Sequence, residues 1–239
     1  MSLLSVERLD SRHGLLQAVR EISLEVEAGE TLALVGANGA GKTTFLRTLA
    51  GAHRPSGGRI TFAGRDVTRV PAHQRVKLGI ALVPEGRRLF PDLTVEENLR
   101  VATAAGRGGR WTVEEVLDTF PLLRPLRHRR AASLSGGEQQ ATAIGRALMT
   151  NPQLLLLDEV SLGLAPAVVE DVYRSLAVLI GAGTTIVLVE QDLTRALGVA
   201  TRVVCMLEGR LVLEGDAGEL SREQVTSAYF GLARGATTP

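Results

Sequence analysis

Cysteine is almost absent from this sequence, since Cys205 is the only one among 239 residues. An internal disulfide is therefore excluded, a zinc site is not supported, and the composition suits a reducing compartment. We expect Cys205 to serve as a small apolar residue in a buried strand.

A strong charge of one sign is also missing, because 27 lysine and arginine residues nearly balance 26 aspartate and glutamate residues. The net charge of +1 gives no argument for a nucleic-acid partner. No stretch approaches the roughly 20 apolar residues that span a bilayer, and runs such as Leu154–Leu157 are too short. The N-terminus does not resemble a signal peptide. We expect a soluble, cytoplasmic protein.

What the sequence does contain is an alternation of short apolar strands with helices. The length suits one domain with an inserted subdomain. Strands are predicted at Leu3–Leu9, Ile22–Val26, Thr31–Val35, Arg59–Phe62, Ile80–Val83, Leu154–Leu157, Thr185–Val189, Val203–Leu207 and Leu211–Glu214. Helices are predicted up to Leu49, near Pro166–Ile180 and near Leu193–Val199, with a hairpin turn at Glu208–Arg210. Apolar runs without polar alternation fit a parallel sheet that is covered on both faces.

The middle of the chain has a helical pattern instead. Thr94 and Glu97 form a capping-box pattern at the start of a helix over Thr94–Ala105, and Val113–Phe120 is helical as well. We interpret residues 87–149 as a helical subdomain inserted in an α/β core of residues 1–86 and 150–234. Residues 235–239 are expected to be a disordered tail.

The segment Gly36–Thr43 (Gly-Ala-Asn-Gly-Ala-Gly-Lys-Thr) matches the phosphate-loop pattern at every required position, between a predicted strand and a predicted helix. Its glycines let successive amides point at an anion, Lys42 supplies a compact cation, and the hydroxyl of Thr43 suits Mg²⁺. The predicted ATP contacts are Gly36, Ala37, Asn38, Gly39, Ala40, Gly41, Lys42, Thr43 and Thr44.

Two adjacent acids, Asp158 and Glu159, follow the predicted strand Leu154–Leu157. The strand delivers them to the carboxyl edge of the sheet, where ligands of open α/β folds bind. Successive strand residues point in opposite directions, so the two acids need not share one role. In isolation, two solvated acids would explain the pattern equally well; the phosphate loop favours a functional pair.

Between these motifs lies Leu134–Gln140 (Leu-Ser-Gly-Gly-Glu-Gln-Gln), which precedes a predicted helix. Two glycines let amides approach an anion, and Ser135 adds a hydroxyl at the positive helix end. Alone, the segment is better explained as a helix cap that contains glycine. In this order with the other motifs, it resembles the signature of ATP-binding cassette (ABC) ATPases, and the resemblance covers nearly the whole chain.

Within that family the sequence is similar to the shorter ATPase subunits (LivF type) of branched-chain amino acid uptake systems. The similarity rests on Val83–Phe90, Thr94–Leu99, Ala143–Met149 and Ser161–Pro166. It implies an α/β P-loop NTPase core with a mainly parallel sheet, an N-terminal antiparallel β subdomain and an inserted α-helical subdomain. Val160 stands where a proline usually follows the acidic pair, and we expect a modestly looser loop there.

The resemblance also implies residue roles. The catalytic residues would be Glu159, Lys42 and Gln191, with Glu159 as the general base. The Mg²⁺ residues would be Thr43, Glu85 and Asp158, the last acting through water. A dimer is implied, in which Ser135, Gly136 and Gly137 of one copy contact the ATP held by the phosphate loop of the other.

Besides Val160, three positions depart from the usual family pattern. Glu85 replaces a glutamine that touches the metal, and a carboxylate can still bind Mg²⁺. Gln191 replaces the switch histidine; its amide can donate to the γ-phosphate but cannot titrate near neutral pH. His13 replaces the aromatic residue that stacks on adenine, and an exposed loop histidine is an equally good interpretation. The remaining histidines are expected to be surface or structural residues: His53, His73 and His128.

The function implied by the resemblance is ATP hydrolysis with dimer closure, coupled to a membrane importer for branched-chain or related amino acids. The implied partners are a second ABC ATPase subunit, integral membrane permease subunits docked near Glu85–Phe90, and indirectly an extracytoplasmic solute-binding protein, with no nucleic acid. The chain would then be peripheral at the inner face of the cell membrane.

Three alternatives remain open at this point. The cargo could be urea, short amides or another small solute. The chain could be a soluble ABC ATPase acting on ribosomes or DNA, although such proteins need tandem cassettes, long coiled coils or metal clusters. It could be a nucleotide-binding regulatory module without turnover, against which an intact Glu159 argues.

Overall fold

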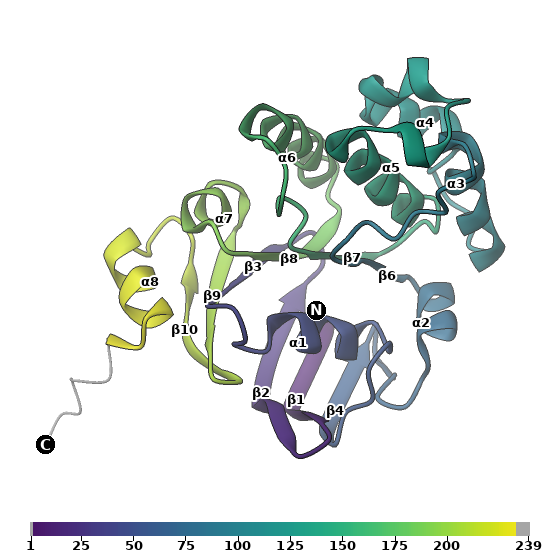
Figure 1. Cartoon of the computed structure of the whole chain (residues 1–239). Helices are drawn as coiled ribbons and strands as arrows, with labels where there is room; N and C mark the ends of the chain where they lie inside the picture. Colours follow the sequence, from purple (N-terminus) through teal and green to yellow (C-terminus); the bar gives the residue numbers. More distant parts are fainter. Residues whose placement is uncertain (1, 233–239) are drawn as a thin grey trace, which may run out of the picture.

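The computed structural model describes residues 2–232, which contain two β-sheets, eight α-helices and three short 3₁₀ helices (Figure 1). The strands are β1 (Ser2–His13), β2 (Leu16–Glu27), β3 (Thr31–Val35), β4 (Gly57–Phe62), β5 (Arg65–Asp66), β6 (Ile80–Val83), β7 (Leu154–Asp158), β8 (Thr185–Glu190), β9 (Arg202–Leu207) and β10 (Arg210–Asp216). The helices are α1 (Lys42–Leu49), α2 (Ala72–Leu78), α3 (Val95–Val101), α4 (Val113–Thr119), α5 (Gly136–Leu148), α6 (Pro166–Gly181), α7 (Leu193–Val199) and α8 (Arg222–Tyr229).

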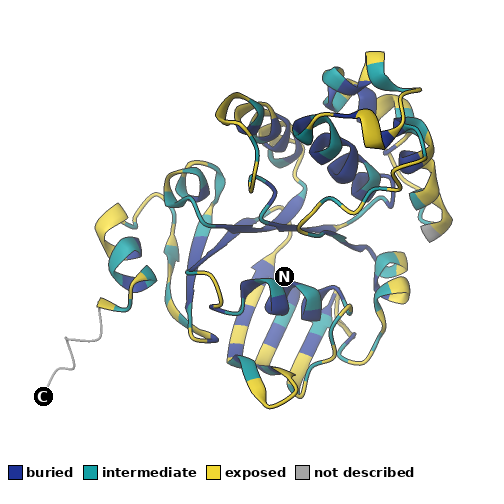
Figure 2. Ribbon diagram, in the orientation of Figure 1, coloured by how far each residue is buried: buried dark blue, intermediate teal, exposed yellow. Residues whose placement is uncertain are grey.

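The larger sheet has the strand order β10-β9-β3-β8-β7-β6 and is mainly parallel. Only the β9–β10 pair is antiparallel within it. Every residue of β3, β7 and β8 is buried, and these strands appear dark blue in Figure 2. The predicted α/β architecture with a mainly parallel, doubly covered sheet is therefore confirmed.

The smaller sheet has the order β2-β1-β4-β5 and is antiparallel, which confirms the predicted N-terminal β subdomain. It packs with α1 against one face of the larger sheet, through a core that includes Phe45, Phe62 and Leu156. Helices α5 and α6 pack on the opposite face, where Ile144, Leu176 and Leu155 share a second core. Figure 1 shows these layers above and below the central strands.

Several local predictions are confirmed by hydrogen bonds. The hydroxyl of Thr94 accepts from the Glu97 amide at 3.2 Å, and the Glu97 carboxylate accepts from the Thr94 amide at 2.7 Å. The β9–β10 hairpin turns at Glu208-Gly209, whose φ values of 47° and 84° match the left-handed turn that such hairpins prefer. Cys205 lies in β9 with no exposure, as predicted, and burial raises the pKa of its thiol to about 11.

Other boundaries differ from the predictions. Strand β1 continues to His13 and β2 begins at Leu16, several residues beyond the predicted ends, and the pairing of the two strands contains register shifts. The helix expected over Thr94–Ala105 is α-helical only to Val101 and continues as a 3₁₀ helix, Ala102–Ala105. Helices α2 and α8 were not predicted.

Helices α3, α4 and α5 all lie between β6 and β7 in the sequence and gather at one side of the sheet in Figure 1. The division of the chain at residues 87 and 149 stays a prediction. Within residues 2–232, no helix is both long and apolar enough to cross a bilayer. The predicted tail, residues 235–239, lies outside the described residues.

Candidate nucleotide-binding site

Three neighbouring strands of the parallel sheet place the predicted motifs at one edge. Strands β3, β8 and β7 are adjacent and parallel, so their carboxyl ends meet. The phosphate loop follows β3, Gln191 follows β8, and Glu159 follows β7. The phosphate loop is more than 100 residues from Glu159, and Glu159 is 32 residues from Gln191. The strand order brings these motifs together.

The phosphate loop requires glycine at two positions because other backbone segments approach it closely. Gly36 has a φ of 151°, and a Cβ added there would lie 2.2 Å from the carbonyl oxygen of Met206 in β9. Gly41 has a φ of 105°, and its Cβ would lie 2.1 Å from the carbonyl oxygen of Ala18 in β2. The loop is thus held between β9 and β2, with no side chain capping the amides that begin α1.

Lys42, the first residue of α1, is 4% exposed and points back into this loop. Its Nζ donates to the carbonyl oxygens of Gly36 at 2.7 Å and Ala37 at 3.1 Å. The same nitrogen lies 3.6 Å from Oε1 of Glu159. The ammonium group of Lys42 is therefore adjacent to the carboxylate of Glu159, the predicted general base.

Thr43 and Asp158 form a second contact between α1 and β7. The Thr43 hydroxyl donates to Oδ1 of Asp158 at 3.0 Å, while Oδ2 is buried and has no partner among the described residues. Burial raises the pKa of Asp158, which the Thr43 hydrogen bond partly opposes, and the nearby Glu159 and Glu85 carboxylates add to the increase. A buried carboxylate oxygen without a donor, beside a hydroxyl, fits a hard cation such as Mg²⁺.

Glu159 is oriented by its backbone and by Gln191. Its φ of 49° lies in the left-handed region, which is unusual for a residue other than glycine. Its Oε2 accepts a 2.6 Å hydrogen bond from the side-chain amide of Gln191. Val160, where the family usually has proline, is 2% exposed and packs in the core near α5 and α6.

A cavity of about 350 Å³ opens onto these groups. Its lining residues are Asn38, Gly39, Gly41, Lys42, Thr43, Glu85, Glu159, Leu162 and Gln191. The structure thus brings the phosphate loop together with Glu159 and Gln191, the other two predicted catalytic residues, and with Glu85.

The predicted trans residues lie elsewhere. Ser135 is the N-cap of α5 and forms a capping box with Glu138, so the helix-cap interpretation describes its local structure. Ser135 and Gly137 line a separate cavity of about 210 Å³. A Cβ at Gly137 would lie 2.1 Å from Cγ1 of Val168, so this glycine permits close packing of α5 on α6. These residues do not line the phosphate-loop cavity of their own chain.

His13 ends β1 beside the phosphate-loop helix. Its Nε2 lies 3.1 Å from the hydroxyl of Thr44, a predicted ATP contact. Its ring centroid lies 4.5 Å from that of His53, which the sequence indicated only as a surface or structural residue. Burial, and next the neighbouring His13, lower the pKa of His53. Forty positions separate the two rings, so no spacing signal could have paired them.

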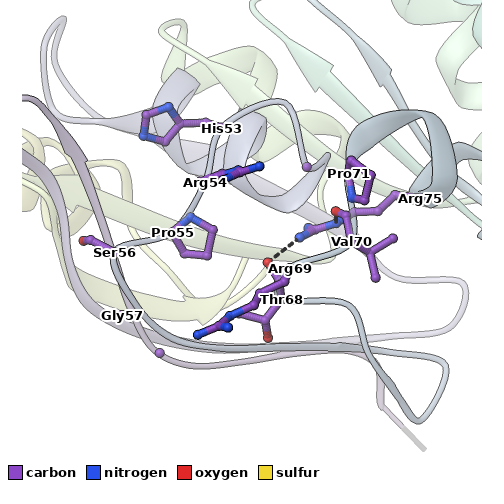
Figure 3. A pocket seen from close by; sticks show the side chains of 12 residues that line it. His53, Arg54, Pro55, Ser56, Gly57, Thr68, Arg69, Val70, Pro71 and Arg75 are labelled. Atoms are coloured by element: carbon purple, nitrogen blue, oxygen red, sulfur yellow. Dashed lines mark hydrogen bonds between the residues drawn. The ribbon is translucent and has the colours of Figure 1, made fainter.

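A different hollow, of about 470 Å³, lies beyond the C-terminal end of α1 (Figure 3). His53, Arg54, Arg69 and Arg75 contribute to its lining, and no lining residue carries a carboxylate. Arg75 is 1% exposed, and its guanidinium donates to the carbonyl oxygens of Thr48, Leu49, Thr68 and Val70. Burial lowers the pKa of Arg75 to about 10. The guanidinium of Arg75 is therefore engaged by backbone carbonyls of the fold.

Known proteins resemble this chain along most of its length. Residues 19–161 match the family model described as ABC transporter. The chain is 42% identical to BraG of Pseudomonas aeruginosa, a high-affinity branched-chain amino acid transport ATP-binding protein, over 96% of this chain and 100% of the relative. It is 34% identical to LivF of Archaeoglobus fulgidus, a probable protein of the same description, over 91% and 94% of the two chains.

Solved structures show the same fold. MJ1267, an ATP-binding cassette of an ABC transporter, superposes with a TM-score of 0.81 at 28% identity, covering 96% of this chain and 99% of the other. A nucleotide-free ATP-binding cassette from an ABC transporter gives a TM-score of 0.80 at 26% identity, covering 95% of each chain.

Proposed function

The chain belongs to the ABC transporter family, and from that premise we propose that it hydrolyses ATP to energise a membrane importer of branched-chain amino acids. One observation carries the proposal: Lys42, the Thr43–Asp158 pair and the Glu159–Gln191 pair surround a single cavity at the edge of the sheet. The full-length similarity to BraG supports the importer assignment.

In the proposed site the triphosphate lies along the phosphate loop and the first turn of α1. The loop amides and Lys42 bind the β- and γ-phosphates. Gln191 donates a hydrogen bond to Glu159, and Nζ of Lys42 lies 3.6 Å from its carboxylate. Both groups would also donate to the γ-phosphate. When ATP binds, Lys42 and Gln191 would therefore replace part of their interaction with Glu159 by contacts to phosphate oxygens.

Thr43, Asp158 and Glu85 would hold Mg²⁺, which neutralises phosphate charge when bound. The unpartnered Oδ2 of Asp158 supports this assignment, as does the position of Glu85 at the cavity wall. Within the described residues, no three acidic, histidine or cysteine side chains gather closely enough to hold a metal alone. The hydroxyl of Thr43 and oxygens of the phosphates would complete the coordination.

Glu159 would act as the general base. It orients a water and accepts its proton as the oxygen attacks the γ-phosphorus, while the bond to the β-phosphate oxygen breaks and ADP leaves. With 11% side-chain exposure, Glu159 is shielded but reachable from the cavity. Its Oε1 lies 3.6 Å from Nζ of Lys42.

A second ATPase subunit is part of the proposal. Ser135 and the phosphate loop line different cavities of one chain, so the signature can meet ATP only if another copy or a homologous subunit supplies it. ATP would then lie between the phosphate loop of one subunit and Ser135, Gly136 and Gly137 of the other.

Permease subunits would dock at the groove between the sheet and the helices α3 and α5. This groove, of about 360 Å³, is lined in part by Arg88, Phe90, Val101 and Arg146. Phe90 and Val101 are 49% and 44% exposed, and the guanidinium of Arg146 lies over the Phe90 ring. An apolar rim with two cations suits a short permease helix. The chain would then be a peripheral protein at the cytoplasmic face, indirectly coupled to an extracytoplasmic solute-binding protein.

The Glu159→Gln variant tests the proposal, with the exposed Glu170→Gln on α6 as its matched control. Glu159→Gln should lower steady-state ATP turnover by at least about 100-fold while it retains ATP binding. With ATP it should also accumulate as a dimer in light scattering, and adding Ser135→Arg should abolish that dimer without loss of ATP binding. Turnover near the wild-type rate in Glu159→Gln would show that the catalytic assignment is wrong.

The cargo requires its own test. Cells that carry Glu159→Gln in place of the wild type should lose uptake of labelled leucine, isoleucine and valine. If uptake of urea or short amides falls instead, the ATPase assignment stands and the cargo assignment does not.

A further inference from the structure

Glu190 is a buried carboxylate on which four donors converge. It is the last residue of β8 and is 2% exposed. Its Oε1 accepts from the hydroxyls of Ser161 and Tyr173, each at 2.6 Å. Its Oε2 accepts from the backbone amides of Gln191 at 3.0 Å and Asp192 at 3.4 Å.

No cation within the described residues forms an ion pair with Glu190 at 4 Å or less. An ionised carboxylate in the interior is costly unless hydrogen bonds replace its lost hydration. Four donors from three segments supply this replacement. Tyr173 stays a donor, because burial and the adjacent Glu190 charge raise the pKa of its hydroxyl.

Two of these four donors, Ser161 and the Gln191 amide, lie next to Glu159 in sequence or in space. Ser161 lies two residues after Glu159, so its hydrogen bond holds the loop that leaves the end of β7. The backbone of Gln191 is held by Glu190, and the side chain of Gln191 donates to Oε2 of Glu159 at 2.6 Å. The Glu159 amide completes the arrangement by donating to the carbonyl oxygen of Val189 at 3.2 Å.

We propose that Glu190 is a positioning residue for the catalytic carboxylate of Glu159, which it holds from two sides through Ser161 and through Gln191. Tyr173 anchors the arrangement on α6. The inference rests on the proposed ATPase function, because it assumes that Glu159 is the base. Glu190 itself does not contact nucleotide, since it lies behind Gln191 and does not line the cavity.

The Tyr173→Phe variant removes one donor while keeping the ring, and Tyr229→Phe on α8 makes the same chemical change away from the network. Tyr173→Phe should lower kcat about threefold to tenfold with the KM for ATP unchanged within about twofold. Tyr229→Phe should leave both constants unchanged. A merely structural contribution of Tyr173 would lower thermal stability while leaving the kcat of the folded protein unchanged.

Ser161 gives a rescue experiment on the other branch. Ser161→Ala should lower kcat by a similar factor, and Ser161→Thr, which keeps the hydroxyl, should restore most of it. The Ser161→Ala/Tyr173→Phe double variant should lose less activity than the product of the single effects, because both donors act on one oxygen. Glu190→Gln should lower kcat more than either single variant, because the NH₂ group of the introduced glutamine would face hydrogen-bond donors in place of an acceptor oxygen.

The outcomes separate the two proposals. If Glu159→Gln is inactive but Tyr173→Phe and Ser161→Ala keep the wild-type kcat, Glu190 does not position the base and only this inference is overturned. If Glu159→Gln turns over ATP at the wild-type rate, the proposed catalytic assignment fails first. Should Glu190→Gln fail to fold, the two hydroxyl variants still decide the matter.

Discussion

The side-chain amide of Gln191 donates a 2.6 Å hydrogen bond to Oε2 of Glu159 and so links the ends of β8 and β7. The family pattern described in the sequence analysis would place a titratable histidine at this position, and this chain has an amide. The amide keeps its donor at every pH, so the position of the proposed catalytic carboxylate does not depend on protonation of its neighbour.

The first prediction concerns the pH dependence of turnover. Wild-type kcat should show no inflection near pH 6.5 that depends on residue 191, whereas Gln191→His should introduce one because imidazole titrates there. Gln191→Ala should lower kcat without a new inflection. The measurement is kcat from pH 5.5 to 8.5. An inflection in the wild type that disappears in Gln191→Ala would contradict the prediction.

The second prediction concerns Gly36. Gly36→Ala should destabilise the protein by more than about 2 kcal/mol and abolish ATP binding, because its Cβ would overlap the Met206 carbonyl. Gly64→Ala is the control, since Gly64 also has a positive φ, of 74°, but no atom lies within 4 Å of the added Cβ. That variant should cost about 1 kcal/mol and retain ATP binding. Urea unfolding and nucleotide titration measure both effects.

The third prediction concerns the buried cation. Arg75→Leu should lower the free energy of unfolding by at least about 3 kcal/mol, because four carbonyl oxygens, two of them in buried contacts, lose the guanidinium as a donor. Arg75→Lys should not restore the loss, since a lysine has no planar fork. Arg69→Leu, an exposed residue of the same hollow, should change stability by less than about 0.5 kcal/mol in urea unfolding. Equal losses in both variants would refute the carbonyl explanation.

The fourth prediction concerns stability against pH. Burial and the adjacent His13 lower the pKa of His53 below its ordinary value of 6.5, so the folded state resists protonation. Well above pH 6.5 the imidazole is neutral in both states and has no effect. As pH falls below 6.5, the unfolded chain binds the proton first, so stability decreases until the lowered folded pKa is passed.

His53→Asn should remove that decrease. The test compares urea midpoints of wild type and variant between pH 8 and pH 5, where the two curves should converge or cross as the pH falls. Parallel curves over the whole range would exclude His53 as the source.

Features that depend on a few consecutive residues were predictable. The phosphate loop, the Thr94 capping box and the Glu208-Gly209 turn each follow from local backbone conformation and short-range hydrogen bonds. The parallel strands were predictable as well, because strands buried on both faces have continuous apolar runs. The ends of β1 and β2 were not, since pairing extends them through polar residues.

Contacts between distant segments that no motif marks could not be predicted. His13 and His53 meet only because β1 ends beside the loop that follows α1. Arg75 and Glu190 are charged, and charged residues are expected at the surface. Their burial depends on carbonyls and hydroxyls that other elements present to them.

The sequence by itself determined the class of the protein and the chemical groups of its site, because a phosphate loop, an acidic pair and a serine-glycine helix start are local patterns. The tertiary structure decided which of those groups meet. Parallel pairing of β3, β8 and β7 brings Lys42, Gln191 and Glu159 to one cavity, while Ser135 lies at another. The reason is physical: hydrogen-bonded turns are set within a few residues, whereas strand order depends on packing across the whole chain.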